Sequence, residues 1–250
     1  MLSELPRPVV LAHRGDRAHA PENTLPSFEL AFSHGADAIE LDAKLTADGH
    51  IVVFHDATLE RTTNGKGRVA RKALTELRVL DAGSYFSEGF RGERIPLLEE
   101  VFDALGKKLI INVELKNYDT PGDDLVERVC DLVVKCGLQE RVIFSSFLAR
   151  NLNKARRLLP GVPRGLLAAR HLAGAWARSF GFSFGDYALL NPCIDDVDSH
   201  AVQRVHRLRR RMFVWTVNKA EDIKRLNGWG VDGIFTDDPA LAIQALGRSS

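Results

Sequence analysis

Eight short apolar runs, many of them β-branched, recur along the 250-residue chain, and longer amphipathic stretches separate them. The runs cover residues 9–12, 38–42 (continued by 51–54), 109–116, 142–145, 165–168, 187–191, 212–217 and 233–236. Apolar runs of this length are typical of strands that are buried on both faces. Eight strands that alternate with helices predict one α/β domain over residues 1–250, a closed (β/α)8 TIM barrel. A doubly wound open sheet is the alternative.

Start and stop signals for helices fall between these runs. Pro26 occupies a position where a first helical turn would begin, and Asp198 or Ser199 is a candidate N-cap. Gly35 and Gly228 lie where helices are expected to end.

One segment, residues 56–95, interrupts the alternation because it is rich in Arg, Thr, Asn and Gly and has no strong period. We interpret it as an insertion at the mouth of the barrel, after the second strand, with a short helix over residues 74–80. The sequence Asn-Gly-Lys-Gly at 64–67 indicates a turn rather than a nucleotide-binding loop. Three aromatic residues of the insertion either pack on the barrel or line the mouth: Tyr85, Phe86 and Phe90.

The charge balance gives no sign of a partner held by overall charge. Lys and Arg number 34 against 33 Asp and Glu, so the net charge of +1 gives no global field for nucleic acid or an anionic membrane. No apolar run approaches the ~20 residues that span a bilayer, and residues 1–11 lack the apolar core of a secretory signal. Cys130, Cys136 and Cys193 lack metal-ligand spacing, so we expect free thiols and a cytoplasmic location.

Polar side chains stand at the ends of several predicted strands, which is where barrel enzymes carry their sites. They are His13 and Arg14 after the first run, Glu40 and Asp42 at the end of the second, His55 and Asp56 after its continuation, Glu114 and Lys116 at the end of the third, and Trp215 to Asn218 at the seventh.

Two of these ends place charged residues at positions i and i+2, so each pair points to one face of its strand. If the intervening leucines face the outer helices, Glu40, Asp42 and Glu114 face the barrel interior together. Three carboxylates at that separation repel one another unless a cation lies between them. Carboxylate oxygens are ligands of hard divalent ions, so we expect a site for Mg²⁺ or Ca²⁺.

The remaining polar residues suit an anionic substrate. Arg14 and Lys116 would face it with positive charge, and His13 and His55 can exchange protons near neutral pH. Asp56 could orient His55, although neighbours on a strand point to opposite faces. Each feature alone fits a structural role, such as a solvated strand end, a salt bridge or a core histidine. Together they favour an active site, because unpaired buried charge is costly.

Other segments have ordinary explanations. The basic residues of 204–211 suit a solvated helix C-terminus better than a nucleic-acid site. The other six histidines show no partner pattern. An aromatic-rich stretch is expected to pack in the core, with a lipid- or substrate-facing lip as the alternative. Its members are Trp176, Phe180, Phe182, Phe184 and Tyr187.

The motifs HRGDRAHAPENT, IELD, FHD, INVELK, FVWTVN and VDGIFTDDP follow one another between residues 13 and 239. In this order they resemble the glycerophosphodiester phosphodiesterase family, over nearly the whole chain. The resemblance implies a (β/α)8 barrel with a small insertion after the second strand. One departure is Arg209-Arg210-Arg211, which stands where a glycine is expected before strand seven.

The resemblance also implies roles for single residues. Glu40, Asp42 and Glu114 would bind the metal, and His13 and His55 would be the acid/base pair. Arg14 and Lys116 would contact the phosphate. Glu22 and Asn23 would brace the mouth of the site, and Trp215 and Asn218 would line it from strand seven.

The implied activity is metal-dependent hydrolysis of a small-molecule glycerophosphodiester, such as glycerophosphocholine or glycerophosphoethanolamine, to sn-glycerol 3-phosphate and an alcohol. Two alternatives are lysophospholipase D-type hydrolysis of a lysophospholipid and a non-catalytic barrel that binds a phosphate ligand. Attack by the substrate's neighbouring hydroxyl, through a cyclic phosphate, and direct attack by water use the same residues. We favour the cyclic route, because intramolecular attack avoids the entropic cost of recruiting water.

Overall fold

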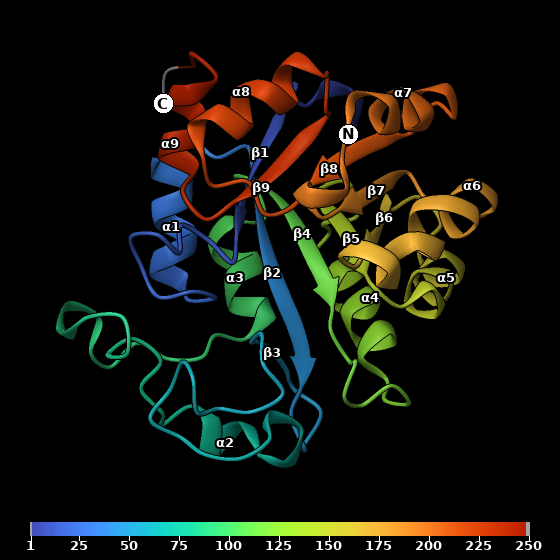
Figure 1. Ribbon diagram of the computed structural model, residues 1–250. Helices are drawn as coiled ribbons and strands as arrows, with labels where there is room; N and C mark the ends of the chain where they lie inside the picture. The colour runs from blue at the N-terminus through green and yellow to red at the C-terminus, as the bar shows by residue number, and fades with distance from the viewer. Residues whose placement is uncertain (1, 249–250) are drawn as a thin grey trace.

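Eight parallel strands close into a barrel in the computed structural model, which describes residues 2–248 (Figure 1). The strands are β1 (Val9–His13), β2 (Ala38–Leu45), β4 (Ile110–Leu115), β5 (Val142–Ser146), β6 (Arg164–Ala168), β7 (Leu189–Pro192), β8 (Arg211–Val214) and β9 (Gly233–Thr236). They follow the order β1-β9-β8-β7-β6-β5-β4-β2, and pairing of β1 with β2 closes the ring. The TIM barrel is therefore confirmed, and the open sheet is wrong.

Helices cover the outside of the ring. They are α1 (Leu25–Ser33), α3 (Leu98–Leu105), α4 (Leu125–Lys135), α5 (Ala149–Leu158), α7 (Ser199–Arg207), α8 (Ala220–Gly228) and α9 (Pro239–Ala245). Between β6 and β7 the chain forms only short pieces: a 3-10 helix (His171–Gly174), a π-helical turn (Ala177–Gly181) and α6 (Phe182–Phe184). Within residues 2–248, no helix combines the length and apolarity needed to cross a bilayer.

The predicted continuation of the second strand is not part of that strand. Residues 51–54 were expected to continue it, but Ile51–Val53 forms β3, which pairs antiparallel with β2 outside the ring. The reversal occurs because Gly49, with a φ of +80°, supplies the left-handed residue of a tight turn.

The local signals at helix ends are mostly confirmed. Asp198 caps α7 by accepting a hydrogen bond from Ala201 N at 2.6 Å. Gly228 is the last residue of α8, as expected, and Gly230, with a φ of +79°, makes the turn that follows. Arg209 has a φ of +55°, so it adopts the left-handed conformation that favours the glycine expected there.

The alternation of side chains along the strands separates two regions of the barrel interior. At the amino ends the interior is filled by apolar side chains, namely Val9, Leu11, Ala38, Ile110, Ile143, Leu189, Phe213 and Phe235. Toward the carboxyl ends of β2 and β4 the inward residues become polar, while Leu41 and Leu115 pack against the helices. The register places Asp42 opposite Glu114 and His13 opposite Glu40. Polar groups therefore gather at one end of a closed ring.

The segment 56–95 lies on the side to which the arrows of β2 and β4 point (Figure 1). Its ordered helix, α2 (Leu74–Leu77), is shorter than the expected 74–80. The segment packs against β3 around a small apolar cluster, made of Val52, Phe54, Leu59, Val69, Leu77, Ala82 and Ile95.

Candidate active site

A cavity of about 220 Å³ opens at the carboxyl ends of the strands, and most of the residues singled out in the sequence line it. These are His13, Arg14, Glu40, His55, Glu114, Lys116 and Trp215. Asn112 and Ser145 add neutral polar groups, and Phe147, Leu167 and Phe235 add an apolar wall. The cavity therefore has a charged side, from β1, β2 and β4, and an apolar side, from β5, β6 and β9.

Three carboxylates converge at the charged side. Oxygens of Glu40, Asp42 and Glu114 lie within 4.8 Å of one another, and all three residues are buried. Burial, together with the charges of Asp42 and Glu114, raises the pKa of Glu40 well above its usual value. Burial also opposes ionisation of Asp42, but Lys116 and Arg14 outweigh it and hold the pKa of Asp42 well below its usual range.

Two cations partly balance these carboxylates. Lys116 Nζ lies 3.2 Å from both Asp42 Oδ1 and Glu114 Oε1, and Arg14 donates its backbone N–H to Glu40 Oε2 at 3.0 Å. Asp42 Oδ1 nevertheless accepts no well-aligned hydrogen bond from the residues that the structure describes. An all-oxygen cluster with a buried, unsatisfied oxygen and excess negative charge fits a hard divalent cation.

Each of the two cavity histidines pairs with an aspartate. His13 Nδ1 lies 2.7 Å from Asp237 Oδ1, and His55 Nδ1 lies 2.5 Å from Asp56 Oδ1. Because an ionised carboxylate only accepts hydrogen bonds, it holds the proton of a neutral imidazole on Nδ1 and leaves Nε2 free. His55 and Arg61 lower the pKa of Asp56 to about 2 against the effect of burial, so this carboxylate is ionised at neutral pH.

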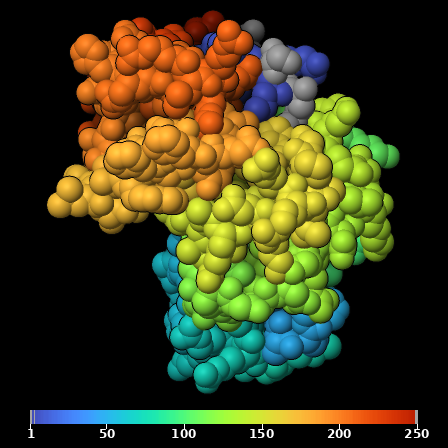
Figure 2. Space-filling view, turned by 90° about the vertical axis from the view of Figure 1, so that its right-hand side faces the viewer, coloured from blue at the N-terminus to red at the C-terminus, as the bar shows by residue number. Residues whose placement is uncertain are grey.

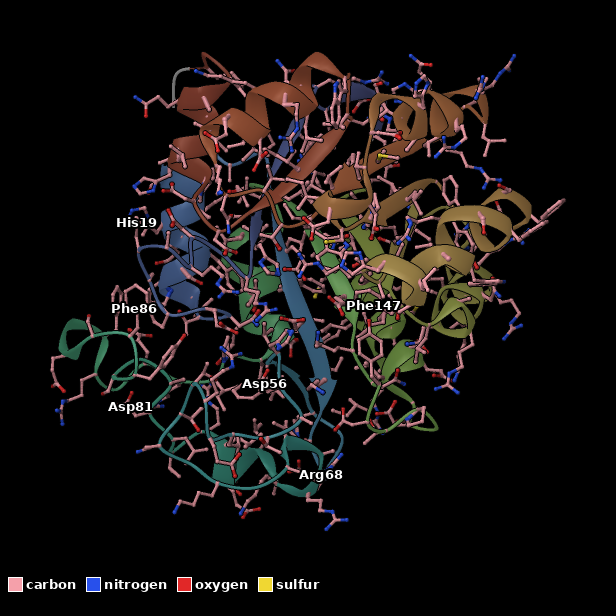
Figure 3. The ribbon with its side chains drawn as sticks, viewed as in Figure 1. His19, Asp56, Arg68, Asp81, Phe86 and Phe147 are labelled. Carbon is pink, nitrogen blue, oxygen red and sulfur yellow. The ribbon has the colours of Figure 1, made fainter. Side chains whose placement is uncertain are left out.

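The His55–Asp56 contact was in doubt from the sequence because neighbours on a strand point apart. β3 ends at Val53, so both residues lie beyond the strand and the rule does not apply to them. Burial lowers the pKa of His55, and the nearby positive charges of Lys116 and Arg14 lower it further, whereas Asp42 opposes them. Figure 3 labels Asp56 where the barrel meets the insertion.

Glu22 and Asn23 do not line the cavity; Glu22 holds Arg14, which does, and Asn23 holds Asp42 of the carboxylate cluster. Glu22 Oε1 accepts a hydrogen bond from Arg14 at 2.9 Å, and Asn23 Nδ2 donates to Asp42 Oδ2 at 2.8 Å. The loop that joins β1 to α1 and carries both residues is tight: Gly15 has a φ of +84°, and a Cβ there would lie 2.3 Å from Ser27 Oγ. Only glycine lets this loop approach α1 so closely.

The aromatic wall is tied together by ring contacts. The ring of Phe147, labelled in Figure 3, lies edge-to-face with Trp215 at 5.9 Å and with Tyr118 at 5.8 Å. Trp215 Nε1 donates to Asn191 O at 2.8 Å, which fixes the indole at the edge of the cavity.

Sequence reasoning missed three residues that complete the site: Asp237, Tyr118 and Arg61. Asp237 holds His13. Asn218, which was predicted to line strand seven, donates to Asp237 Oδ2 at 2.8 Å. Tyr118 donates to Glu114 Oε1 at 2.7 Å, and Arg61 of the insertion bridges Glu22 and Asp56. Asp237 has a usable signal, because it follows the last predicted strand at its carboxyl end. Arg61 has none, because it lies in a segment without period.

A closed barrel whose carboxyl end combines a carboxylate cluster, two cations and two His–Asp pairs is typical of one class of protein, the barrel enzymes that act on anionic substrates. Comparisons with known proteins narrow this class. The model of the Glycerophosphoryl diester phosphodiesterase family matches residues 13–241. The glycerophosphodiester phosphodiesterase of Caldanaerobacter subterraneus subsp. tengcongensis is 40% identical over 94% of this chain and 96% of its own.

Solved structures of similar fold point to the same family. An Oleispira antarctica phosphodiesterase, determined in complex with the product sn-glycerol-3-phosphate, superimposes with a TM-score of 0.87 at 32% identity, covering 98% of each chain. A glycerophosphodiester phosphodiesterase of Agrobacterium tumefaciens gives a TM-score of 0.82 at 27% identity, covering 94% of this chain and 98% of its own. The chain belongs to the glycerophosphoryl diester phosphodiesterase family and is therefore a phosphoric diester hydrolase.

The ion pairs of Glu22 predict that the free energy of unfolding falls in acid over a defined pH range. Burial would raise the pKa of Glu22, but Arg61 and Arg14 outweigh it and lower the pKa from 4.5 to about 2. The unfolded chain then binds this proton more readily, so stability is present above about pH 5 and is lost toward about pH 2. We expect Glu22→Gln to remove about 3 kcal/mol of this pH dependence, measured by urea unfolding across that range.

The exposed Glu88, paired with Arg91 on the insertion surface, provides a matched control. Glu88→Gln should follow the pH dependence of the parent chain. Parallel curves for the parent and Glu22→Gln would contradict the assignment of this stability to Glu22.

Proposed function

We propose that the chain hydrolyses glycerophosphodiesters, such as glycerophosphocholine or glycerophosphoethanolamine, to sn-glycerol 3-phosphate and an alcohol. The observation that carries the proposal is the pair of His–Asp contacts facing one cavity that also holds the carboxylate cluster. The product complex of the Oleispira relative supports the choice of product. A barrel that only binds phosphate would need neither His–Asp pair, so the non-catalytic alternative has less support.

Glu40, Asp42 and Glu114 would hold the divalent cation, Mg²⁺ or Ca²⁺. When bound, such a cation neutralises phosphoryl oxygens and acts as a Lewis acid. With the carboxylates neutralised in this way, Lys116 and Arg14 retain positive charge for the phosphodiester itself. Arg14 Nε is buried and has no hydrogen-bond partner among the described residues, so it is available as a donor.

The two sides of the cavity suit the two ends of the substrate. The phosphate would lie against the charged side, and the alcohol group would leave along the wall of Phe147, Leu167 and Trp215. Residues 56–95 would shape access, although their aromatic residues do not line the cavity. Tyr85 accepts a hydrogen bond from Glu22 N at 2.9 Å, and Phe86 contacts Phe90.

Proton transfer would use the two Nε2 atoms, of which the one on the base begins without a proton and the one on the acid begins with one. In the cyclic route the hydroxyl next to the phosphoester attacks phosphorus and gives its proton to one histidine. The bond from phosphorus to the alcohol breaks, and the other histidine protonates the leaving oxygen. Water then opens the cyclic phosphate, with each histidine in the reverse role. Asp237 and Asp56 would hold the two rings in orientation throughout both steps.

Metal removal tests the carboxylate cluster. We expect a chelator to abolish release of glycerol 3-phosphate, and Mg²⁺ or Ca²⁺ to restore it. Glu114→Gln should weaken binding of the metal more than about tenfold in a calorimetric titration, because it removes a charged ligand. Glu99→Gln is the control, because Glu99 lies on α3, outside the cavity, and pairs with Lys135; this variant should bind as the parent does. Full activity of a Glu40→Ala/Glu114→Ala variant in chelator would overturn the assignment.

Histidine replacement tests the proton chemistry. We expect His13→Ala and His55→Ala each to lower kcat by about 10²–10⁴, because general acid/base catalysis contributes that much. His50 is a matched control, since it also faces an aspartate, Asp48 at 3.3 Å, but does not line the cavity. His50→Ala should keep full activity. A loss below about threefold for either cavity histidine would remove it from the mechanism.

A modified substrate separates the two routes. In a diester whose neighbouring hydroxyl is replaced by hydrogen, the internal nucleophile is missing while the phosphate contacts remain. The cyclic route predicts that this compound inhibits competitively, with an affinity near that of the substrate, and is not turned over. Turnover at a near-normal rate would establish direct attack by water.

A further inference from the structure

Four large apolar side chains are exposed in the connection between β6 and β7. Leu172 is 90% exposed, Trp176 57%, Phe180 70% and Phe184 83%. We call these four residues the aromatic lip. Core packing was the main expectation for this stretch, and it is right only for Phe182 and Tyr187, which are buried. Exposing several large apolar side chains together is unfavourable in water and is typical of interaction sites.

The lip has an ordered core and a neighbouring groove. The rings of Phe180 and Phe184 stack at 5.9 Å, and the Trp176 ring lies directly over Gly181, where a Cβ would come within 2.7 Å of it. Phe180 and Phe184 also border a groove of about 520 Å³ between this segment and α7. In Figure 2 the segment, drawn in gold, projects from the surface at the left edge of the view. An apolar ridge that projects from the surface fits a partner that is deformable and extends beyond the ridge.

The lip begins at the mouth of the catalytic cavity. Leu167, three residues after the start of β6 at Arg164, lines that cavity. Just beyond, Arg170 forms an ion pair with Asp195, and His171 N donates to Asp196 Oδ2 at 2.8 Å. These contacts fix the start of the segment to the loop that follows β7, at the carboxyl end of the barrel.

The charges around the lip favour an anionic partner. Three acidic residues of the region pair with arginine: Asp186 with Arg156 and Arg164, Asp195 with Arg170, and Asp196 with Arg178. Asp198 instead caps α7. Arg204 borders the groove beside Phe180 and Phe184 and has no carboxylate partner among residues 2–248. A second copy of the chain would bring the same unpaired cation to a two-fold contact, which opposes self-association.

We infer that the aromatic lip docks on an anionic lipid surface, with its apolar side chains among the lipids and Arg204 at their headgroups. Aromatic side chains and arginine are the residues that favour the membrane–water boundary. Docking in this way brings the cavity mouth to the lipid. If the proposed function holds, the substrates then include amphiphilic diesters such as lysophospholipids, taken from that surface.

Co-sedimentation with vesicles tests the docking without any need for catalysis. We expect the full chain to sediment with vesicles made from phosphatidylcholine and phosphatidylglycerol, and weakly with phosphatidylcholine alone. Phe184→Ser, at a side chain with few native contacts, should lower the partition coefficient about tenfold, and Trp176→Ser/Phe180→Ser/Phe184→Ser should abolish sedimentation. Arg204→Gln should reduce the preference for the anionic vesicles.

Phe32→Ser is the matched control, because Phe32 is a 45% exposed aromatic residue on α1, across the barrel from α6 (Figure 1). It should sediment like the parent. Circular dichroism confirms that each variant is folded, and kcat/KM on soluble glycerophosphocholine should stay within about twofold of the parent, since the lip lies outside the cavity. Sedimentation of the folded Phe184→Ser and triple variants at the parent level would overturn the inference. Failure of the parent chain to sediment with any vesicle would also overturn it. So would the finding that the parent is a dimer and that Phe184→Ser dissociates this dimer.

Discussion

The site depends on the electrostatics of three buried carboxylates at the carboxyl end of the barrel, where the cavity opens. Glu40, Asp42 and Glu114 are less than a tenth exposed, so their mutual repulsion is poorly screened by water. Lys116 and Arg14 are placed where they offset that repulsion, and both are themselves largely buried. One carboxyl group, that of Glu40, is still driven toward its protonated form. The arrangement is therefore costly for a chain alone, and binding of a cation and an anionic substrate would relieve it.

Much of this site follows from the sequence because the strand period is simple. Leucines alternate with charged residues in β2 and β4, so a period of two places the carboxylates inside the ring. The closing pair β1–β2 then brings His13 level with Glu40. Eight apolar runs with helices between them also suffice to predict the barrel. Helices connect such parallel strands by right-handed crossovers, and eight of these units close into a ring.

Other features do not follow from a period. β3 was misread because residues 51–53 are as apolar as a buried strand, and only the turn at Gly49 reverses them. Arg61 lies in an irregular segment, so nothing in its neighbourhood indicates that it reaches back to the site. The aromatic residues around Phe180 were expected in the core because composition does not distinguish a buried aromatic stretch from an exposed one. In each case the deciding interaction joins residues that are distant in sequence or lie outside regular elements.

The contacts of Arg61 give the irregular insertion a physical role in the barrel. Arg14 bonds to Glu22, Glu22 to Arg61, Arg61 to Asp56, and Asp56 to His55. This chain of charges runs from a residue facing the carboxylate cluster, through the insertion, and back to a cavity histidine. Because Arg14, Glu22, Arg61 and Asp56 are joined by ion pairs and Asp56 is hydrogen-bonded to His55, movement of the insertion would displace both ends of the chain. The insertion thus acts as a brace for the charged side of the cavity, while the ring contacts of Phe147 with Tyr118 and Trp215 stabilise the apolar side.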